Sequence, residues 1–196
     1  NVPFRADGLH RILYKCPHCG SENQMEGKGI HLTCHACEKR WTMDQYGQLS
    51  AKDGNTEYPH IPDWYQWQRA CVRKELEDET YVLDTDVEIG VQVNLDGICM
   101  IGDGHLTHNS DGFHLTGGDG LLDYRQSPVF SHTLYSDYYW YEIGDVIGIG
   151  DNEFSYFCFP KTNVSVTKAR LATEELYKLK RQRKREKITK KAVSEA

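Results

Sequence analysis

The sequence predicts an α+β protein that is mainly β, because three patterns follow one another along its 196 residues. Two Cys-x-x-Cys pairs lie near the start of the chain. Apolar residues at helical spacing follow after residue 60, and short alternating segments with glycine-rich turns occupy residues 80–166. A last helical pattern runs into a stretch of Lys and Arg. The chain therefore divides into residues 1–50, 51–79, 80–185 and a basic end, 186–196.

The two cysteine pairs predict a metal site. Cys16 and Cys19 enclose Pro-His, and Cys34 and Cys37 enclose His-Ala. One tight turn brings both sulfurs of a pair to the same ion, and a second pair completes a tetrahedron. Four thiolates select zinc and leave no open position for a substrate, so we expect a structural Zn²⁺ in a rubredoxin-like zinc ribbon over residues 1–50. Redox dithiols or disulfides are the alternative, and they suit two joined knuckles less well.

The first 50 residues are too few to fold through hydrophobic burial alone. Metal binding contributes roughly 10–16 kcal/mol to the folding of such small domains, so we expect the ribbon to depend on its ion. Strands are expected at residues 9–15 and 40–43, with Trp41 packed beside the metal site. Glu38 follows the second cysteine pair, where glycine would adopt the left-handed turn of a zinc knuckle at a lower cost.

Residues 51–79 are predicted to form a linker and a tryptophan-rich helix. The segment 50–60 is polar and rich in turn formers, and Pro62 and Asp63 suit the first turn of a helix. Trp64, Trp67 and Cys71 then recur at i, i+3 and i+7 and form one apolar face. Such a face is more often a packing surface than a binding site, and we expect it to pack against the ribbon or the sheet.

Residues 80–185 are predicted to form a β-barrel closed by a helix. Seven short segments alternate polar and apolar residues, with a hairpin turn at 109–112. These candidate strands are Tyr81–Leu83, Val87–Val93, His105–His108, Phe113–Thr116, Tyr138–Ile143, Val146–Ile149 and Phe154–Phe159. A helical pattern over 167–184 follows, with Val166, Ala169 and Leu176 on its inner side. Seven strands and one closing helix are the order of a pleckstrin-homology-like barrel, an analogy that carries no function by itself.

The sequence predicts no catalytic set. A P-loop, a nucleophile elbow and an HExxH motif are all absent. His114 with Asp119, and His132 with Asp137, match the His-x4-Asp spacing of glycerolipid acyltransferases, in which the histidine acts as a base. The His and Asp content yields such matches by chance, and no Glu-Gly-Thr-Arg-type sequence follows either one. We therefore assign no catalytic residue.

Two further patterns have simple interpretations. The stretch 117–124 half resembles a calcium-binding nonapeptide, but such turns bind calcium only when several copies stack, so we expect a glycine loop. His105, His108 and His114 could gather as metal ligands. Because alternation places His105 and His108 on opposite faces of a strand, ordinary surface histidines are the preferred interpretation.

Charge is unevenly distributed along the chain, which has a net charge of −6. Residues 75–124 contain twelve Asp and Glu and no Lys or Arg, which argues against nucleic acid as a partner. Nine Lys and Arg lie between Lys178 and Lys191. We expect residues 186–196 to form a disordered, solvated end, and an anionic membrane surface is the functional alternative for the basic segment.

The sequence also predicts the compartment of the protein and its relation to a longer chain. No run of 18 apolar residues is present, so no transmembrane segment is expected. Seven cysteines, four of them in two knuckles, fit a reducing compartment better than a disulfide scaffold. We therefore expect a cytoplasmic protein, at the membrane surface if the basic segment binds lipid. The chain begins with Asn1, which is expected for a piece of a longer protein.

Four stretches of the chain resemble one known family. They are Leu9–Gly20, His60–Trp67, Gly104–His108 with Gly112-Phe113, and Ala172–Tyr177, and Ile61-Pro-Asp-Trp-Tyr65 is the most specific of these sequences. Together they resemble the C-terminal extension of bacterial lysophospholipid acyltransferases of the 1-acyl-sn-glycerol-3-phosphate acyltransferase type, found chiefly in Firmicutes. The resemblance covers nearly the whole chain.

The resemblance implies that acyl transfer belongs to an N-terminal domain outside this sequence, which would be the partner of this chain. Only the four cysteines correspond to functional positions, as zinc ligands. The chain would then be a non-catalytic accessory or regulatory module of an enzyme of phospholipid biosynthesis. Two alternatives stay open: a zinc-ribbon module that binds nucleic acid or protein, and an independent enzyme that uses the cavity of the barrel.

Overall fold

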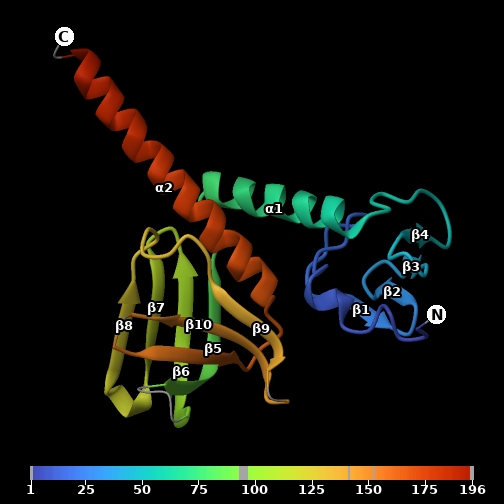
Figure 1. Ribbon diagram of the computed structural model, residues 1–196, viewed down its shortest axis with the longest axis horizontal. Helices are drawn as coiled ribbons and strands as arrows, with labels where there is room; N and C mark the ends of the chain where they lie inside the picture. Colours follow the sequence, from blue (N-terminus) through green and yellow to red (C-terminus); the bar gives the residue numbers. More distant parts are fainter. Residues whose placement is uncertain (1, 93–96, 141, 152, 195–196) are drawn as a thin grey trace. The chain divides into compact units, whose positions relative to one another are not determined.

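The computed structural model describes residues 2–92, 97–140, 142–151 and 153–194. Its two α-helices and two antiparallel sheets make the protein α+β and mainly β, as predicted (Figure 1). The chain forms two compact units, Asn1–Cys71 and Val72–Ala196. The boundary between them falls within helix α1, Ile61–Glu77.

The first unit contains a four-stranded sheet whose strands follow one another in sequence order. The strands are β1 (Met25–Lys28), β2 (His31–Cys34), β3 (Arg40–Met43) and β4 (Leu49–Ala51). The predicted strand at 40–43 is confirmed, whereas the one predicted at 9–15 is wrong. Its first residues form the short 3-10 helix η1, Leu9–Arg11. Leu9 and Leu13 are both buried, and residues four apart share one side of a helical turn.

The segment predicted as a linker, 50–60, belongs to this first unit. The backbone N–H of Leu49 donates to the carbonyl of Pro59 at 2.7 Å, and the N–H of Ala51 donates to Thr56 Oγ1 at 2.9 Å. Lys39 Nζ lies 2.6 Å from Glu57 Oε1. These contacts hold the segment against β3 and β4.

The core of the first unit is built around two tryptophans. Trp41 of β3 and Trp64 of α1 are fully buried, and their rings meet edge to face with centroids 5.0 Å apart. Leu13, Leu32 and Leu49 belong to the same cluster, as do two of the four cysteines. The packing interpretation of the helix face that contains Trp64 is therefore confirmed.

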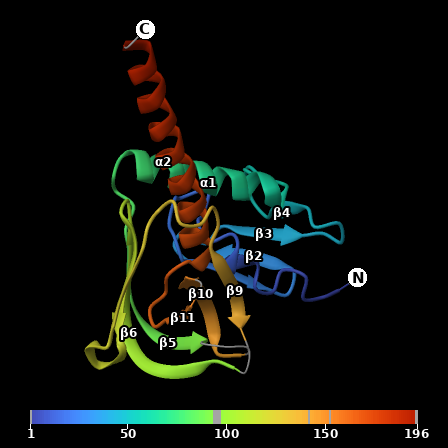
Figure 2. The same ribbon diagram turned by 60° about the vertical axis from the view of Figure 1, so that its left-hand side comes forward.

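The second unit contains a seven-stranded antiparallel sheet (Figure 2). Its strands are β5 (Leu83–Gln92), β6 (Cys99–Asn109), β7 (Gly112–Gly117), β8 (Leu122–Gln126), β9 (Tyr135–Trp140), β10 (Gly144–Gly150) and β11 (Ser155–Pro160). The order across the sheet is β8-β7-β6-β5-β11-β10-β9. Pairing of β5 with β11 thus joins a four-stranded meander to a three-stranded one.

The sheet differs from the predicted barrel in three respects. The predicted strand from 87 onward belongs to β5, whereas only Leu83 of the predicted strand 81–83 does, and Val93 lies outside the described residues. Strand β8 was not predicted, because a glycine loop is expected over 117–124. Within that stretch only the turn η2 (Gly118–Gly120) is such a loop, and β8 begins at Leu122. The edge strands β8 and β9 are not paired with each other within the described ranges, so the sheet is not a closed barrel.

Helix α2, Val166–Ser194, follows the sheet. Its buried side contains the expected residues Val166, Ala169 and Leu176, and the stripe continues to Leu179. The predicted disordered end from residue 186 is wrong as far as Ser194, because these residues continue the helix. Among the described residues, no helix is both long and apolar enough to cross a bilayer.

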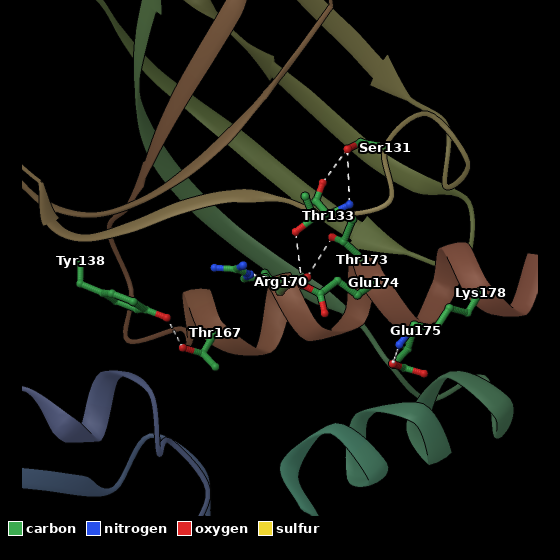
Figure 3. A network of polar contacts seen from close by, with 10 residues as sticks. Ser131, Thr133, Tyr138, Thr167, Arg170, Thr173, Glu174, Glu175 and Lys178 are labelled. Atoms are coloured by element: carbon green, nitrogen blue, oxygen red, sulfur yellow. Dashed lines mark hydrogen bonds and ion pairs between the residues drawn. The ribbon is translucent and has the colours of Figure 1, made fainter. Parts of the chain in front are cut away.

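Polar contacts fix the N-terminal half of α2 against the segment that leads into β9 (Figure 3). Thr133 Oγ1 donates to Glu174 Oε1 at 3.2 Å, and Arg170 Nε lies 3.3 Å from the same oxygen. The hydroxyls of Tyr138 and Thr167 are also hydrogen-bonded. The contacts of Thr133 with Glu174 and of Tyr138 with Thr167 join residues more than 25 positions apart, so they orient the helix on the sheet.

His108 is not a surface histidine as predicted, because it is 1 % exposed. Its ring stacks on Phe113 with centroids 3.7 Å apart, and its Nδ1 lies 3.0 Å from the hydroxyl of Tyr81. Burial lowers the pKa of His108 to about 3. The core of the second unit therefore contains a neutral imidazole.

We expect the second unit to lose stability in mild acid because of His108. Its folded pKa of about 3 lies below the ordinary value of 6.5, so its contribution is complete above pH 6.5 and is lost as the pH falls toward 3. The native chain should lose about 1.4 kcal/mol per pH unit from this group. His108→Gln, which can still accept from Tyr81, should unfold in urea with a smaller dependence on pH between 6 and 4. Equal slopes for both proteins would contradict the assignment.

Candidate metal centre

The four predicted cysteines meet at one point in the first unit. All four Sγ atoms lie within 4.8 Å of one another. Cys16 Sγ is 3.8 Å from Cys37 Sγ, and Cys19 Sγ is 3.8 Å from Cys34 Sγ. A tetrahedron with metal–sulfur bonds of about 2.3 Å has edges of about 3.8 Å, so these spacings suit an ion such as Zn²⁺. The sequence-based choice of ligands is consistent with this geometry.

Each cysteine pair lies on a tight turn that points both sulfurs inward. In the first turn the N–H of Gly20 donates to the carbonyl of Cys16 at 2.9 Å, and Gly20 has a φ of 77°. In the second turn the N–H of Cys34 donates to the carbonyl of Lys39 at 2.9 Å. Glu38 has a φ of 61°, the left-handed conformation expected for this position.

The electrostatics of the cluster favour a cation at its centre. Burial raises the pKa of the Cys16 and Cys37 thiols, so on their own they would resist ionisation. Burial also opposes ionisation of Cys19, but hydrogen bonds with Ser21, Cys16 and Cys37 together outweigh it and lower the pKa of Cys19 to about 6. A divalent cation among the sulfurs would overcome this resistance to ionisation, because a bound cation deprotonates coordinating thiols outright.

Helix α1 holds the first cysteine turn through two buried side chains. The indole N–H of Trp64 donates to the carbonyl of Lys15 at 2.9 Å. Gln68 is fully buried: its Nε2 donates to the carbonyl of Ile12, and its Oε1 accepts from the N–H of Lys15 at 3.0 Å. Sequence analysis missed Gln68. Its position four residues after Trp64, on the same helical face, was the available signal.

The two His-x4-Asp matches do not form catalytic pairs. His114 Nε2 lies 2.8 Å from Asp123 rather than near Asp119. The ring of His132 faces Tyr177 across 6.3 Å, and Asp137 accepts from the adjacent N–H of Tyr138.

The three histidines considered as metal ligands also stay apart. His105 lies between two carboxylates, with Nδ1 2.9 Å from Asp86 and Nε2 3.1 Å from Asp84. The hydrogen bond with Asp86 raises the pKa of His105. Over the part of the chain that the structure describes, the cysteine quartet is the one group of three or more His, Cys, Asp or Glu side chains close enough to share an ion.

A hollow of about 330 Å³ lies at one end of the seven-stranded sheet. Gln126, Tyr135 and Tyr156 are among its lining residues. The N–H of Gly150 donates to Gln126 Oε1 at 3.1 Å, which links the end of β8 to the end of β10. Neither His114 nor His132 lines this hollow.

Comparisons of the chain with protein-family models, curated proteins and solved structures find no significant match.

Glu38→Gly should stabilise the first unit. A left-handed backbone costs about 1–2 kcal/mol for a residue with a side chain, and glycine removes this cost. The greater conformational freedom of glycine in the unfolded chain offsets part of the resulting gain in stability. We expect the free energy of unfolding of the metal-loaded protein to rise by about 0.5–1 kcal/mol. Thermal unfolding measures the change. Glu38→Ala keeps Cβ and should show no gain, so equal stabilisation by both substitutions would contradict the role of backbone strain.

Proposed function

We propose that this chain is a zinc-stabilised, non-catalytic accessory module of a phospholipid-synthesising acyltransferase. The zinc assignment rests mainly on one observation, the convergence of four cysteine sulfurs within 4.8 Å. A site with four protein thiolates has no position left for water or substrate, so its role is to hold the fold. Zinc fits best because the ligands are all soft sulfur and the spacings suit a tetrahedron.

The environment of the cluster supports a structural role. Three of the four cysteines are buried or half-buried, and Cys19 is exposed. Trp41 and Trp64 belong to the same core cluster as Cys16 and Cys34. Loss of the ion would therefore open the core of the unit rather than expose a reactive centre.

The link to an acyltransferase rests on the sequence resemblance. Its most specific stretch, residues 61–65, contains Trp64, the side chain that binds the carbonyl next to the first cysteine turn. The resembling residues therefore include a contact on which the metal centre depends. The separation of His114 from Asp119 supports the view that acyl transfer takes place elsewhere in such a protein.

A pleckstrin-homology-like arrangement is our proposal for the second unit. Four strands in a meander, three more in a second meander and a C-terminal helix support it. The hydrogen bond between Gly150 and Gln126 draws the end of β8 toward β10, as partial closure of such a sheet requires. We propose that this unit supports or regulates an acyltransferase domain of the same protein.

Metal analysis tests the zinc assignment. We expect one zinc per chain by plasma mass spectrometry, because the four thiolates complete one coordination sphere. Cys16→Ser with Cys37→Ser should lose the metal and the folded first unit. Cys71→Ser with Cys99→Ser removes the same number of thiols outside the cluster and should keep both. Bound iron that changes oxidation state, or the absence of any metal, would contradict a structural zinc site. The cysteine pairs would then be interpreted as redox-active.

An acyl-transfer assay tests the absence of catalysis. The purified chain, offered a long-chain acyl thioester and a lysophosphatidate, should release no thiol above the uncatalysed rate. The reason is that no described histidine is paired with the aspartate of its motif. Turnover that His114→Ala or His132→Ala abolishes would overturn the proposal in favour of an independent enzyme.

A further inference from the structure

The C-terminal half of α2 concentrates cations on one side. An α-helix turns by about 100° per residue, which places each side chain around the axis. Between residues 180 and 191, every residue within one sector of about 120° is Lys or Arg. We name this set the basic face: Lys180, Arg183, Lys184, Lys187, Lys190 and Lys191.

The basic face continues the side of the helix that packs on the sheet. Val166, Ala169 and Leu176 occupy the same sector farther toward the N-terminus, and they are buried. Beyond Leu179 the sheet no longer covers this side: Lys180 is half-buried and residues 181–192 are exposed. Figures 1 and 2 both show this half of α2 extending past the end of the sheet.

The charges on this face do not compensate one another. Like charges three or four positions apart on a helix repel, and Arg183, Lys187 and Lys191 form such a row. Glu186 is the one acid between residues 178 and 194, and it lies outside the basic face, where Gln182 donates to it at 2.9 Å. Five residues of the basic face form no ion pair within the described part of the chain: Lys180, Arg183, Lys184, Lys187 and Lys190. Counter-charge for these five comes from another molecule.

The acidic remainder of the chain does not supply this counter-charge. The exposed part of the helix is about 20 Å long, whereas charges are screened over about 8 Å at physiological ionic strength. The last turns of α2 therefore act on a partner independently of the acidic residues 75–124. A regular helix also presents its cations at fixed positions along one side, which suits an extended anionic surface.

We propose that the basic face binds the surface of a bilayer that contains anionic lipid, by charge attraction and without insertion. Five of its six residues are Lys, a compact point charge that lacks the planar fork with which Arg recognises nucleic acid. Ile188 is the one large apolar residue in the exposed stretch 181–192, so the helix has no apolar side to insert. This inference depends on α2 alone and stands whether or not the acyltransferase proposal holds.

The binding should be weak and reversible. Each cation near an anionic surface strengthens binding by about fivefold. Cations alone, without a buried lipid chain or apolar side, lose most of this attraction as salt rises. Stable attachment would need a second contact with the membrane, since lasting anchors combine two signals.

Vesicle sedimentation tests the proposal with the zinc-loaded chain. We expect binding to vesicles of phosphatidylcholine with phosphatidylglycerol at low salt, loss of binding at about 0.5 M salt, and no binding to phosphatidylcholine alone. Lys184→Gln with Lys187→Gln removes two charges from the basic face and should weaken binding about 25-fold. Arg181→Gln with Arg185→Gln removes two charges from the opposite side of the same turns and should weaken it no more than about threefold.

Lys184→Arg with Lys187→Arg keeps the charge and should bind like the native chain, which separates charge from helix stability. Circular dichroism should show that all three variants keep their helix. The proposal is overturned by any of three results: no binding to anionic vesicles at low salt, equal weakening in the two Gln variants, or tighter binding of duplex RNA through the same face. The last result would assign the basic face to nucleic acid.

Discussion

The convergence of four cysteine sulfurs is the constraint on which the first unit depends. Its sheet has strands of only three or four residues, which cannot hold a fold through their own pairing. The second cysteine turn instead joins the end of β2 to the start of β3, and Trp41 and Trp64 belong to the same core cluster as Cys16 and Cys34. Gln68 and Trp64 then tie α1 to the first turn through the backbone of Ile12 and Lys15.

The second unit is organised by a different contact, the pairing of β5 with β11. This pairing joins two local meanders that are separated in sequence, and it makes one continuous sheet from them. Helix α2 then covers the sheet with its N-terminal half only, held by Thr133, Glu174 and Thr167. The same side of the helix thus serves two purposes, since it is apolar where the sheet covers it and cationic where the sheet ends.

Features that depend on residues close together in the chain were predictable from the sequence, whereas features that depend on distant contacts were not. The helix at 61–77 and the strand at 40–43 were predictable because apolar periodicity is a local signal. Glu38 was predictable as a left-handed residue because the geometry of a cysteine turn is local. Strand β8 was missed because the glycine-rich stretch 117–124 predicts a loop, although Asp123 and Arg125 alternate with less exposed neighbours. Pairing with β7 makes the segment a strand. His108 was misjudged because its burial depends on Phe113 and Tyr81, which meet it only in the folded sheet.

The sequence by itself determined the four candidate metal ligands, the fold class and the concentration of positive charge near the C-terminus. Each of these follows from residue types at short spacing, so no knowledge of distant contacts was needed. The tertiary structure alone decided that the sheet stays open, that residues 51–60 belong to the first unit, and that α2 continues beyond the sheet as a helix. These outcomes depend on which segments far apart in the chain share hydrogen bonds and buried surface, and local patterns do not encode that pairing.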